Sequence, residues 1–382
     1  MARASSFAAR VIAWQREHGR HDLPWQNTRD PYRIWVSEIM LQQTQVAAVI
    51  GYYARFMQRF PDLASLALAS QEEVMRHWAG LGYYSRARNL HQAACIVRDD
   101  WGGVLPATAQ QLETLPGIGR STAAAIAVFA HGARAAILDG NVKRVVARCF
   151  GVAGYPGDKK VEEALWERVS GLLPGTGTEA YTQGLMDLGA TLCTRSKPAC
   201  ASCPLQTDCV AHRSGRTAEL PHRKPPKAVP QRQCVMLVLL NRRKVLLEKR
   251  PSPGIWGGLW CLPQFDAEAQ VRPWLEQAGP KQVGIDWRER RRLDPIEHGF
   301  THYRLTIRPL VLARRAIAPG GVGARSRQAA VRTAASAQAR EQLWLSLDQA
   351  AGAALPAPIK TLLLRLCVPG AIKGILSGRE GG

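Results

Sequence analysis

The chain has 382 residues, which is more than one hydrophobic core usually serves, so two domains are expected. Its apolar fraction of 46% is typical of a globular protein, and no apolar stretch approaches the length of a membrane span. The net charge of +21 favours a polyanionic partner.

The charge is unevenly distributed along the chain. Residues 1–210 hold 22 Lys or Arg against 18 Asp or Glu, whereas residues 211–382 hold 29 against 12. Most of the basic residues are arginines, and solubility or an arginine-rich composition would also explain such an excess. Charge alone therefore does not decide the function.

The first 211 residues predict an all-α domain. The opening sequence MARASSFAARVIAWQREHG is typical of an amphipathic helix rather than a signal peptide. Thr108-x-x-Gln111 resembles a capping box, and this half shows no convincing strand pattern. Apolar residues recur at helical spacing in 34–60, 63–80, 86–100, 108–114, 120–131, 142–150, 160–172 and 179–190.

The second half predicts an α+β domain over 234–368, after a basic, proline-rich linker at 212–233. Strands are expected at 234–240, 244–249, 302–312 and 344–347, and helices at 266–277 and 357–367. The segment 318–340 consists mostly of Gly, Ala, Arg and Ser, which predicts a disordered insertion, and 369–382 is expected to be a flexible tail.

Four cysteines form the most specific motif of the chain, with the spacing C-x6-C-x2-C-x5-C at Cys193, Cys200, Cys203 and Cys209. Four thiolates so close in sequence can converge on one [4Fe–4S] cubane, where each iron takes one sulfur. Tetrahedral zinc is the alternative metal, and two disulfides are a weaker alternative because nothing else resembles a secreted protein. Basic residues inside the loop would suit a contact with a nucleic-acid backbone.

The heptapeptide LPGIGRS at 115–121 is the second strong motif. We expect Gly117 and Gly119 to adopt positive φ and to bring backbone amides close to a ligand. The helix that begins at Arg120 would then offer free N–H groups and its positive dipole end to a phosphate. This predicts a helix-hairpin-helix at about 108–131 that grips DNA regardless of sequence, with an ordinary turn as the alternative.

Two acids are candidates for catalysis. Glu38 is the only carboxylate between Asp30 and Asp62 and lies in an apolar helix, so burial should raise its pKa and let it donate a proton. Asp139 follows an apolar run and opens a helix, where capping is its ordinary role. A proton donor and an ionised carboxylate together suit cleavage of a glycosidic bond through an oxocarbenium-like state.

These motifs resemble the MutY family of adenine DNA glycosylases, within the helix-hairpin-helix superfamily. The resemblance covers most of residues 20–210 and is weaker in the C-terminal half. It implies a [4Fe–4S] cluster, an active site between two helical subdomains, and a Nudix-like C-terminal domain that recognises the damaged base. The matching stretches are 23–25, 35–45, 80–89, 115–122, 137–144, the four cysteines, 254–263 and 298–305.

The resemblance also implies roles for individual residues. Glu38 matches the general acid that protonates adenine, Asp139 the carboxylate that stabilises the sugar cation, and Asn141 a residue that positions the site. Residues that wedge into the duplex match Gln42, Gln43 and Tyr83, and the remaining DNA contacts match Leu115, Gly117, Gly119, Ser121 and Arg144. Recognition of 8-oxoguanine is expected from Phe300, Thr301 and His302, where Thr301 replaces the usual serine.

Ser121 distinguishes two kinds of glycosylase. In the related endonuclease III family a lysine at this place forms a Schiff base and cuts the strand, which a serine cannot do. We therefore expect a monofunctional enzyme that removes adenine opposite 8-oxoguanine, and less well opposite guanine, although Lys143 is a conceivable adventitious amine. The C-terminal half lacks the glutamate array of a Nudix hydrolase, so nucleotide hydrolysis is not expected.

Two other functions are compatible with the motifs: an endonuclease III-like glycosylase and lyase for another base, and a non-catalytic iron–sulfur protein that binds DNA. The expected partners are double-stranded DNA with adenine mispairs and proteins that repair abasic sites. We expect a monomer in the bacterial cytoplasm, associated with the nucleoid through DNA and not with a membrane.

Overall fold

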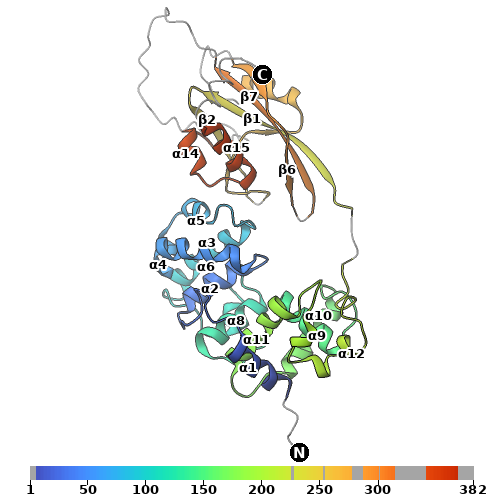
Figure 1. Cartoon of the computed structure of the whole chain (residues 1–382). Coiled ribbons are helices and arrows are strands. Elements are labelled where there is room, and N and C mark those ends of the chain that lie inside the picture. Colours follow the sequence, from blue (N-terminus) through green and yellow to red (C-terminus); the bar gives the residue numbers. More distant parts are fainter. Residues whose placement is uncertain are drawn as a thin grey trace, which may run out of the picture. The chain divides into compact units, whose positions relative to one another are not determined.

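The computed structural model describes residues 6–224, 228–252, 254–277, 287–300, 302–314 and 341–368. The chain divides into two compact units (Figure 1). The first comprises Met1–Val74 and Ser85–Pro226, and the second comprises Met75–Tyr84 and Lys227–Gly382. Within the described ranges no helix is long and apolar enough to cross a membrane.

The N-terminal part of the chain is helical, as predicted. A π-helical turn, Leu188–Leu192, continues α11 directly into the cysteine loop. The helices are α1 (Phe7–His18), α2 (Pro31–Leu41), α3 (Val46–Arg59), α4 (Leu63–Leu68), α5 (Gln71–Trp78), α6 (Ser85–Asp100), α7 (Ala109–Leu112), α8 (Arg120–His131), α9 (Gly140–Phe150), α10 (Lys159–Gly171), α11 (Thr178–Asp187) and α12 (Val210–Arg213).

Two expected helices are each broken in two. The segment 34–60 forms α2 and α3, because the chain turns at Gln42–Gln45 and Gln43 adopts a positive φ of 58°. The segment 63–80 forms α4 and α5, since α4 ends at Ala69 in extended backbone. The apolar spacing continues across both breaks because the helices on either side bury residues in the core, so periodicity alone does not show them.

Helix α8 is central to the first unit. It packs against α2 and α7, and also against α11, which in turn contacts α1 and α9. Seven of its residues are buried, mostly alanines that allow close helix approach. The helix thereby joins the part of the unit that carries Glu38 to the part that carries Asp139, and it begins at the predicted hairpin.

The second unit contains a mixed eight-stranded sheet with the central order β3-β2-β1-β7-β5. The long strands β1 and β7 run parallel, from Gln231 paired with Arg304 to Leu240 paired with Ala313. The elements are β1 (Gln231–Asn241), β2 (Lys244–Lys249), β3 (Trp260–Cys261), β4 (Gln264–Phe265), α13 (Val271–Gln277), β5 (Trp287–Arg292), β6 (Ile296–Gly299), β7 (Arg304–Arg314), β8 (Gln342–Ser346), α14 (Leu347–Ala351) and α15 (Ala357–Cys367).

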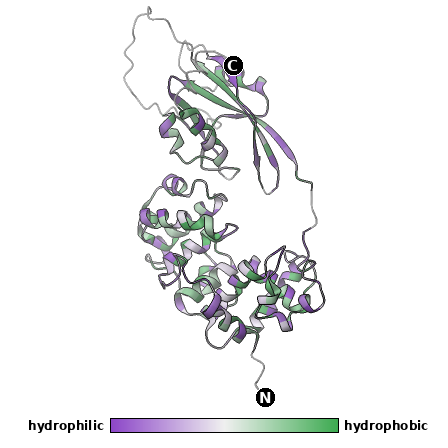
Figure 2. Cartoon of the chain, viewed as in Figure 1, coloured by the Kyte–Doolittle hydropathy of each residue, from purple (hydrophilic) through white to green (hydrophobic). Residues whose placement is uncertain are grey.

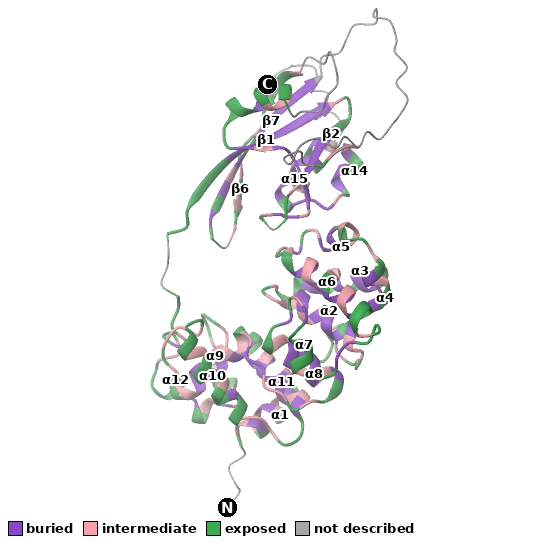
Figure 3. Ribbon diagram, turned by 180° about the vertical axis from the view of Figure 1, so that it is seen from behind, coloured by how far each residue is buried: buried purple, intermediate pink, exposed green. Residues whose placement is uncertain are grey.

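The core of this unit forms on the central strands, which are apolar in Figure 2 and buried in Figure 3. The predicted α+β class is confirmed. The four expected strands and the helix at 357–367 form at nearly the expected bounds, whereas the segment 266–277 forms a 3₁₀ turn, Glu268–Gln270, before α13. Strands β3, β4, β5 and β6 and helix α14 were not expected; the WRERRR sequence of β5, for example, has no alternation of apolar and polar residues. The predicted insertion 318–340 and tail 369–382 lie outside the described residues.

Candidate active site

A large cleft in the first unit contains both predicted acids. Its volume is about 1380 Å³, and its lining comes from α2, the turn after α2, the start of α8, the start of α9, α10 and α11. Glu38 and Asp139 both line it, together with Asn141, Gln42 and Ser121. The fold thus brings into one cleft residues that are a hundred positions apart in the sequence.

Glu38 lies in the last turn of α2 between the buried residues Ser37 and Ile39. Burial penalises the charged form and, with a smaller effect from the negative charge of Asp139, raises the pKa of Glu38 to about 7. A carboxylic acid with that pKa retains its proton at near-neutral pH, as a general acid must.

Asp139 is the N-cap of α9. One carboxylate oxygen accepts a hydrogen bond from the Val142 N–H at 2.8 Å, and the other accepts one from Asn141 Nδ2 at 3.3 Å. Burial raises the pKa of Asp139, whereas these hydrogen bonds and the charge of Arg144 oppose that shift. The capping role and a catalytic role are therefore compatible, because the cap fixes the carboxylate at the edge of the cleft.

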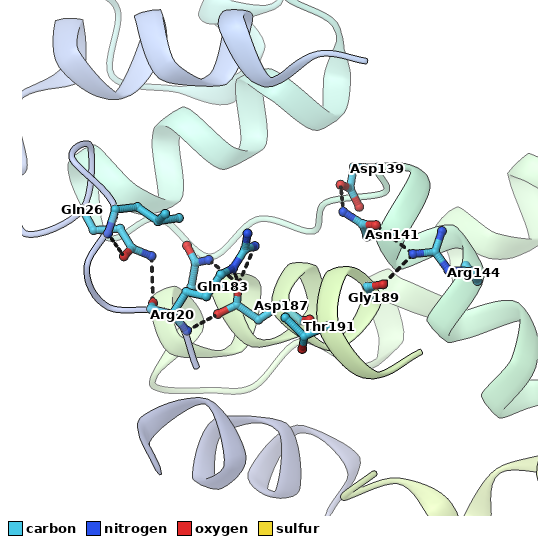
Figure 4. A network of polar contacts seen from close by, with 10 residues as sticks. Arg20, Gln26, Asp139, Asn141, Arg144, Gln183, Asp187, Gly189 and Thr191 are labelled. Carbon is cyan, nitrogen blue, oxygen red and sulfur yellow. Dashed lines mark hydrogen bonds and ion pairs between the residues drawn. The ribbon is translucent and has the colours of Figure 1, made fainter. Parts of the chain in front are cut away.

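Asn141 is itself held by a network with Arg144 and Gly189 (Figure 4), which continues to the cysteine loop through Cys193. Arg144 Nη2 donates to Asn141 Oδ1 at 2.8 Å and to the Gly189 carbonyl at 2.6 Å, and Arg144 Nε donates to the Cys193 carbonyl at 2.7 Å. The guanidinium of Arg144, predicted to contact DNA, is thus engaged with acceptors of the protein.

Gly189 lies directly against α9, and its carbonyl accepts the hydrogen bond from Arg144. A Cβ atom on Gly189 would come 2.4 Å from Asn141 Cβ and 2.9 Å from Asn141 Cα. Only glycine allows this approach without a shift of one helix.

A second polar network, which sequence reasoning missed, lies on α11 (Figure 4). Asp187 is completely buried and accepts hydrogen bonds from the backbone N–H of Arg20 at 2.9 Å, from Arg20 Nε at 2.7 Å and from Gln183 Nε2 at 2.9 Å. Arg20 and Gln183 both line the cleft. The signal was present in the sequence, since Asp187 is an isolated acid in an apolar segment, as Glu38 is.

The hairpin has the expected form with one correction. Gly117 adopts φ +82°, but Gly119 has φ −92° and serves as the extended N-cap of α8, so the expectation of a positive φ at Gly119 was wrong. The conformation needs only one left-handed residue before the helix begins. The Leu115 side chain is buried, and Ser121 Oγ accepts a hydrogen bond from the Leu138 N–H at 3.0 Å.

The residues predicted to wedge into the duplex come from two segments. Gln42 and Gln43 are in the turn beside the hairpin, and Tyr83 is in the segment Met75–Tyr84. Gln42 Nε2 donates to the Gly117 carbonyl at 3.3 Å and to Thr122 Oγ1 at 3.2 Å, so the turn after α2 is tied to the hairpin. Gln43 follows in a left-handed conformation. Tyr83 belongs to the segment Met75–Tyr84 of the other unit, where it has φ +49° and is 42% exposed.

The four cysteines of the motif line one small cavity. Buried Arg148 donates to Cys193 Sγ at 3.3 Å and to the Thr194 carbonyl at 2.7 Å, which fixes the beginning of the loop. Among the described residues no three His, Cys, Asp or Glu side chains are close enough together for a single metal ion. Four thiolates around one cavity are the donor set of both tetrahedral zinc and iron–sulfur clusters.

The predicted lesion-recognition residues lie in the loop between β6 and β7 of the second unit. The Phe300 ring packs at 4.6 Å from the His298 ring and 5.4 Å from the Trp256 ring, and the Phe300 N–H donates to the Tyr303 carbonyl at 2.8 Å. His302 lies beside this aromatic group and is exposed. Thr301 lies outside the described residues.

Comparisons with known proteins identify the family. A model of the HhH-GPD superfamily base excision DNA repair proteins matches residues 36–170, and a NUDIX domain model matches 234–365. The adenine DNA glycosylase of Buchnera aphidicola from Acyrthosiphon pisum is 36% identical over 80% of this chain and 86% of its own length. This chain belongs to the adenine DNA glycosylase family.

Other relatives agree with that assignment. The human adenine DNA glycosylase is 34% identical over 82% of this chain and 68% of its own length. Among solved structures, a thermostable thymine-DNA glycosylase is 32% identical with a TM-score of 0.50, and the match covers 55% of this chain and 95% of that one. The helical glycosylase fold and the Nudix-like domain of the family are thus both present.

Proposed function

We propose that this protein is an adenine DNA glycosylase of base excision repair that hydrolyses the N-glycosidic bond of adenine opposite 8-oxoguanine, and less well opposite guanine. One observation carries the proposal: an acid with a pKa of about 7, Glu38, and a capped carboxylate, Asp139, line the same cleft. Membership of the family supports the choice of adenine as the base.

In the proposed reaction the two acids have different roles. Glu38 donates its proton to a ring nitrogen of the extruded adenine, so that the base leaves neutral as the bond to C1′ breaks. Asp139, which the N-terminus of α9 holds in place, stabilises the positive charge that develops on the sugar. Addition of water at C1′, with one water proton passing to the now ionised Glu38, then leaves an abasic site.

The surroundings of Ser121 support a monofunctional reaction. Its hydroxyl accepts the Leu138 N–H, and it offers no amine to form a Schiff base. The amine considered as an alternative, Lys143 Nζ, is ion-paired with Glu162 Oε1 at 2.8 Å. Strand cleavage should therefore require alkali or a second enzyme.

DNA binding is proposed to use the backbone of the hairpin and the turn after α2. A Cβ on Gly119 would meet nothing within 4 Å, so a phosphate can approach the N-terminus of α8 closely. Gln42 and Gln43 in the adjacent turn, and Tyr83, would enter the base stack as the adenine is extruded.

We assign the [4Fe–4S] cluster to Cys193, Cys200, Cys203 and Cys209. When bound, the cluster supplies four covalent cross-links within the loop that contains Arg195 and Lys197. These cations are proposed to lie along the DNA backbone, while Arg148 fixes the start of the loop through Thr194.

A single-turnover assay tests the proposed function. Duplexes carry adenine opposite 8-oxoguanine, guanine, cytosine or thymine, and products are measured with and without alkali. We expect adenine release fastest opposite 8-oxoguanine, with breaks only after alkali. Breaks without alkali would identify a lyase, and binding without release from any duplex would support the non-catalytic alternative.

Recognition of 8-oxoguanine by the second unit needs its own test. The aromatic group around Phe300 suggests a surface on which a base can stack. We expect Phe300→Ala to reduce the preference for 8-oxoguanine over guanine opposite the adenine, with the rate on the guanine mispair nearly unchanged. An equal loss on both substrates would contradict the assignment.

A further inference from the structure

Arg86 contacts the turn that follows α2, the helix that carries Glu38. Its side chain comes from α6 and is 7% exposed. Nη1 donates to the carbonyls of Ile39 at 2.9 Å, Met40 at 2.7 Å and Gln42 at 2.6 Å. Nη2 donates to Thr44 Oγ1 at 3.0 Å.

These hydrogen bonds link the end of α2 to the turn that follows it, because one guanidinium binds acceptors in both. The last carbonyls of a helix have no hydrogen-bond partner within it. Arg86 binds two such carbonyls of α2, those of Ile39 and Met40, which directly follow Glu38. The same guanidinium binds the backbone of Gln42 and the side chain of Thr44, on both sides of Gln43 with its positive φ. A planar fork with several fixed donors suits such a set of acceptors, and a lysine ammonium does not.

We propose that Arg86 is a positioning residue that holds the turn 42–45 in the shape needed to extrude the target base. The turn lines the cleft, and Gln42 also reaches the hairpin through Gly117 and Thr122. Arg86 therefore sets where the turn stands relative to the hairpin that grips the strand. The inference rests on the proposed function and adds a residue to which that function assigns no role.

The experiment compares two duplexes that differ only in the cost of extrusion. In the first, adenine opposite 8-oxoguanine has fully paired neighbours, and in the second the neighbouring pairs are mismatched and already weakly stacked. Single-turnover rates are measured for the wild type, Arg86→Lys and Thr44→Val, and the burst amplitude reports the fraction of active protein. Arg98→Lys is the matched control, because Arg98 is also on α6 but binds the Ala67 carbonyl at the end of α4.

We expect Arg86→Lys to lower the rate on the paired duplex by about tenfold, the effect of losing one charged hydrogen bond, with a much smaller loss on the mismatched duplex. Thr44→Val should change the rates in the same direction but less, and Arg98→Lys should leave both unchanged. Equal losses on both duplexes, or a fall in burst amplitude alone, would overturn the proposal. Absence of adenine release by the wild type would instead refute the proposed function.

Discussion

The two walls of the cleft hold their carboxyl groups by different means. On the α2 wall, Glu38 stands among buried residues, and burial sets its pKa. On the α9 wall, Asp139 is bound by the helix N-terminus and by Asn141, and a chain of hydrogen bonds continues through Arg144 to the cysteine loop. Burial raises the pKa of both acids, and on the α9 wall hydrogen bonds and the charge of Arg144 oppose that rise.

This difference bears on the protonation states of the two acids: at Asp139 hydrogen bonds oppose the effect of burial, whereas at Glu38 the negative charge of Asp139 adds to it. An apolar surrounding stabilises the protonated form, which can donate. Hydrogen bonds from N–H groups stabilise the ionised form, which can face a cation. Four kinds of change test this difference: loss of the Glu38 proton, disturbed packing beside Asn141, a change of pH, and loss of the hydrogen bond between Ser121 and the Leu138 N–H.

The largest effect is expected from Glu38→Gln, which leaves the shape of the α2 wall but removes its proton. The single-turnover rate should fall by roughly 10²- to 10⁴-fold, the usual contribution of a general acid. Binding to the same duplex, measured by fluorescence anisotropy, should be nearly unchanged. Full turnover by this variant would refute the role of Glu38.

The next largest loss of rate is expected from a change in the packing of Gly189 against Asn141 of α9. Gly189→Ala places a Cβ against Asn141, so α9 or the π-helical turn Leu188–Leu192 must move, and a shift of α9 would move Asp139 with it. A displacement of that size should lower the rate by about 10²-fold. Gly171→Ala, where nothing lies within 4 Å of the new Cβ, is the matched control and should retain the wild-type rate. If Gly189→Ala and Gly171→Ala react at equal rates, close packing of Gly189 against α9 is not needed for the reaction, and the prediction is wrong.

The effect of burial on Glu38 should appear in the pH dependence. With a pKa of about 7 in the folded protein, Glu38 loses its proton as pH rises through 7, and the single-turnover rate should fall there. The assay is run from pH 5 to 9 on the 8-oxoguanine mispair. A rate that is flat across pH 7 would show that Glu38 is not the donor.

The same burial should affect stability. Because the folded protein binds the Glu38 proton more tightly than the unfolded chain, the wild type loses stability as pH rises from about 4.5 to 7. Glu38→Gln lacks this loss, so it should be more stable than the wild type by about 3 kcal/mol at pH 8 and by little at pH 4. Urea unfolding at the two pH values measures the difference.

The smallest effect is expected from Ser121→Ala, which removes the hydrogen bond that Leu138 N–H makes just before Asp139. We expect a loss of about 1 kcal/mol in the free energy of unfolding and only a modest change in rate. Thermal unfolding of the variant beside the wild type checks the first, and the single-turnover assay checks the second. A large loss of rate would assign Ser121 a direct role in catalysis.

Sequence reasoning can identify candidates where the signal is local. The cysteine spacing, the hairpin glycine Gly117 and an acid isolated in an apolar helix can each be recognised within a short window. It failed where the signal depends on partners far away in the chain. The break at Gln42–Gln45 and the strand β5 depend on such packing, and Arg86 and Asp187 gave no sign of their partners.

Motifs and periodicities along the chain identify the family, the fold classes of the two halves and the residue types that could do the chemistry. The shared cleft of Glu38 and Asp139, the rise of the Glu38 pKa to about 7 through burial, and the hydrogen bonds that engage Arg144 follow only from the folded chain. Burial and hydrogen bonding depend on neighbours in space, and α8 connects these neighbours because it packs against α2 and against α11, which in turn contacts α9.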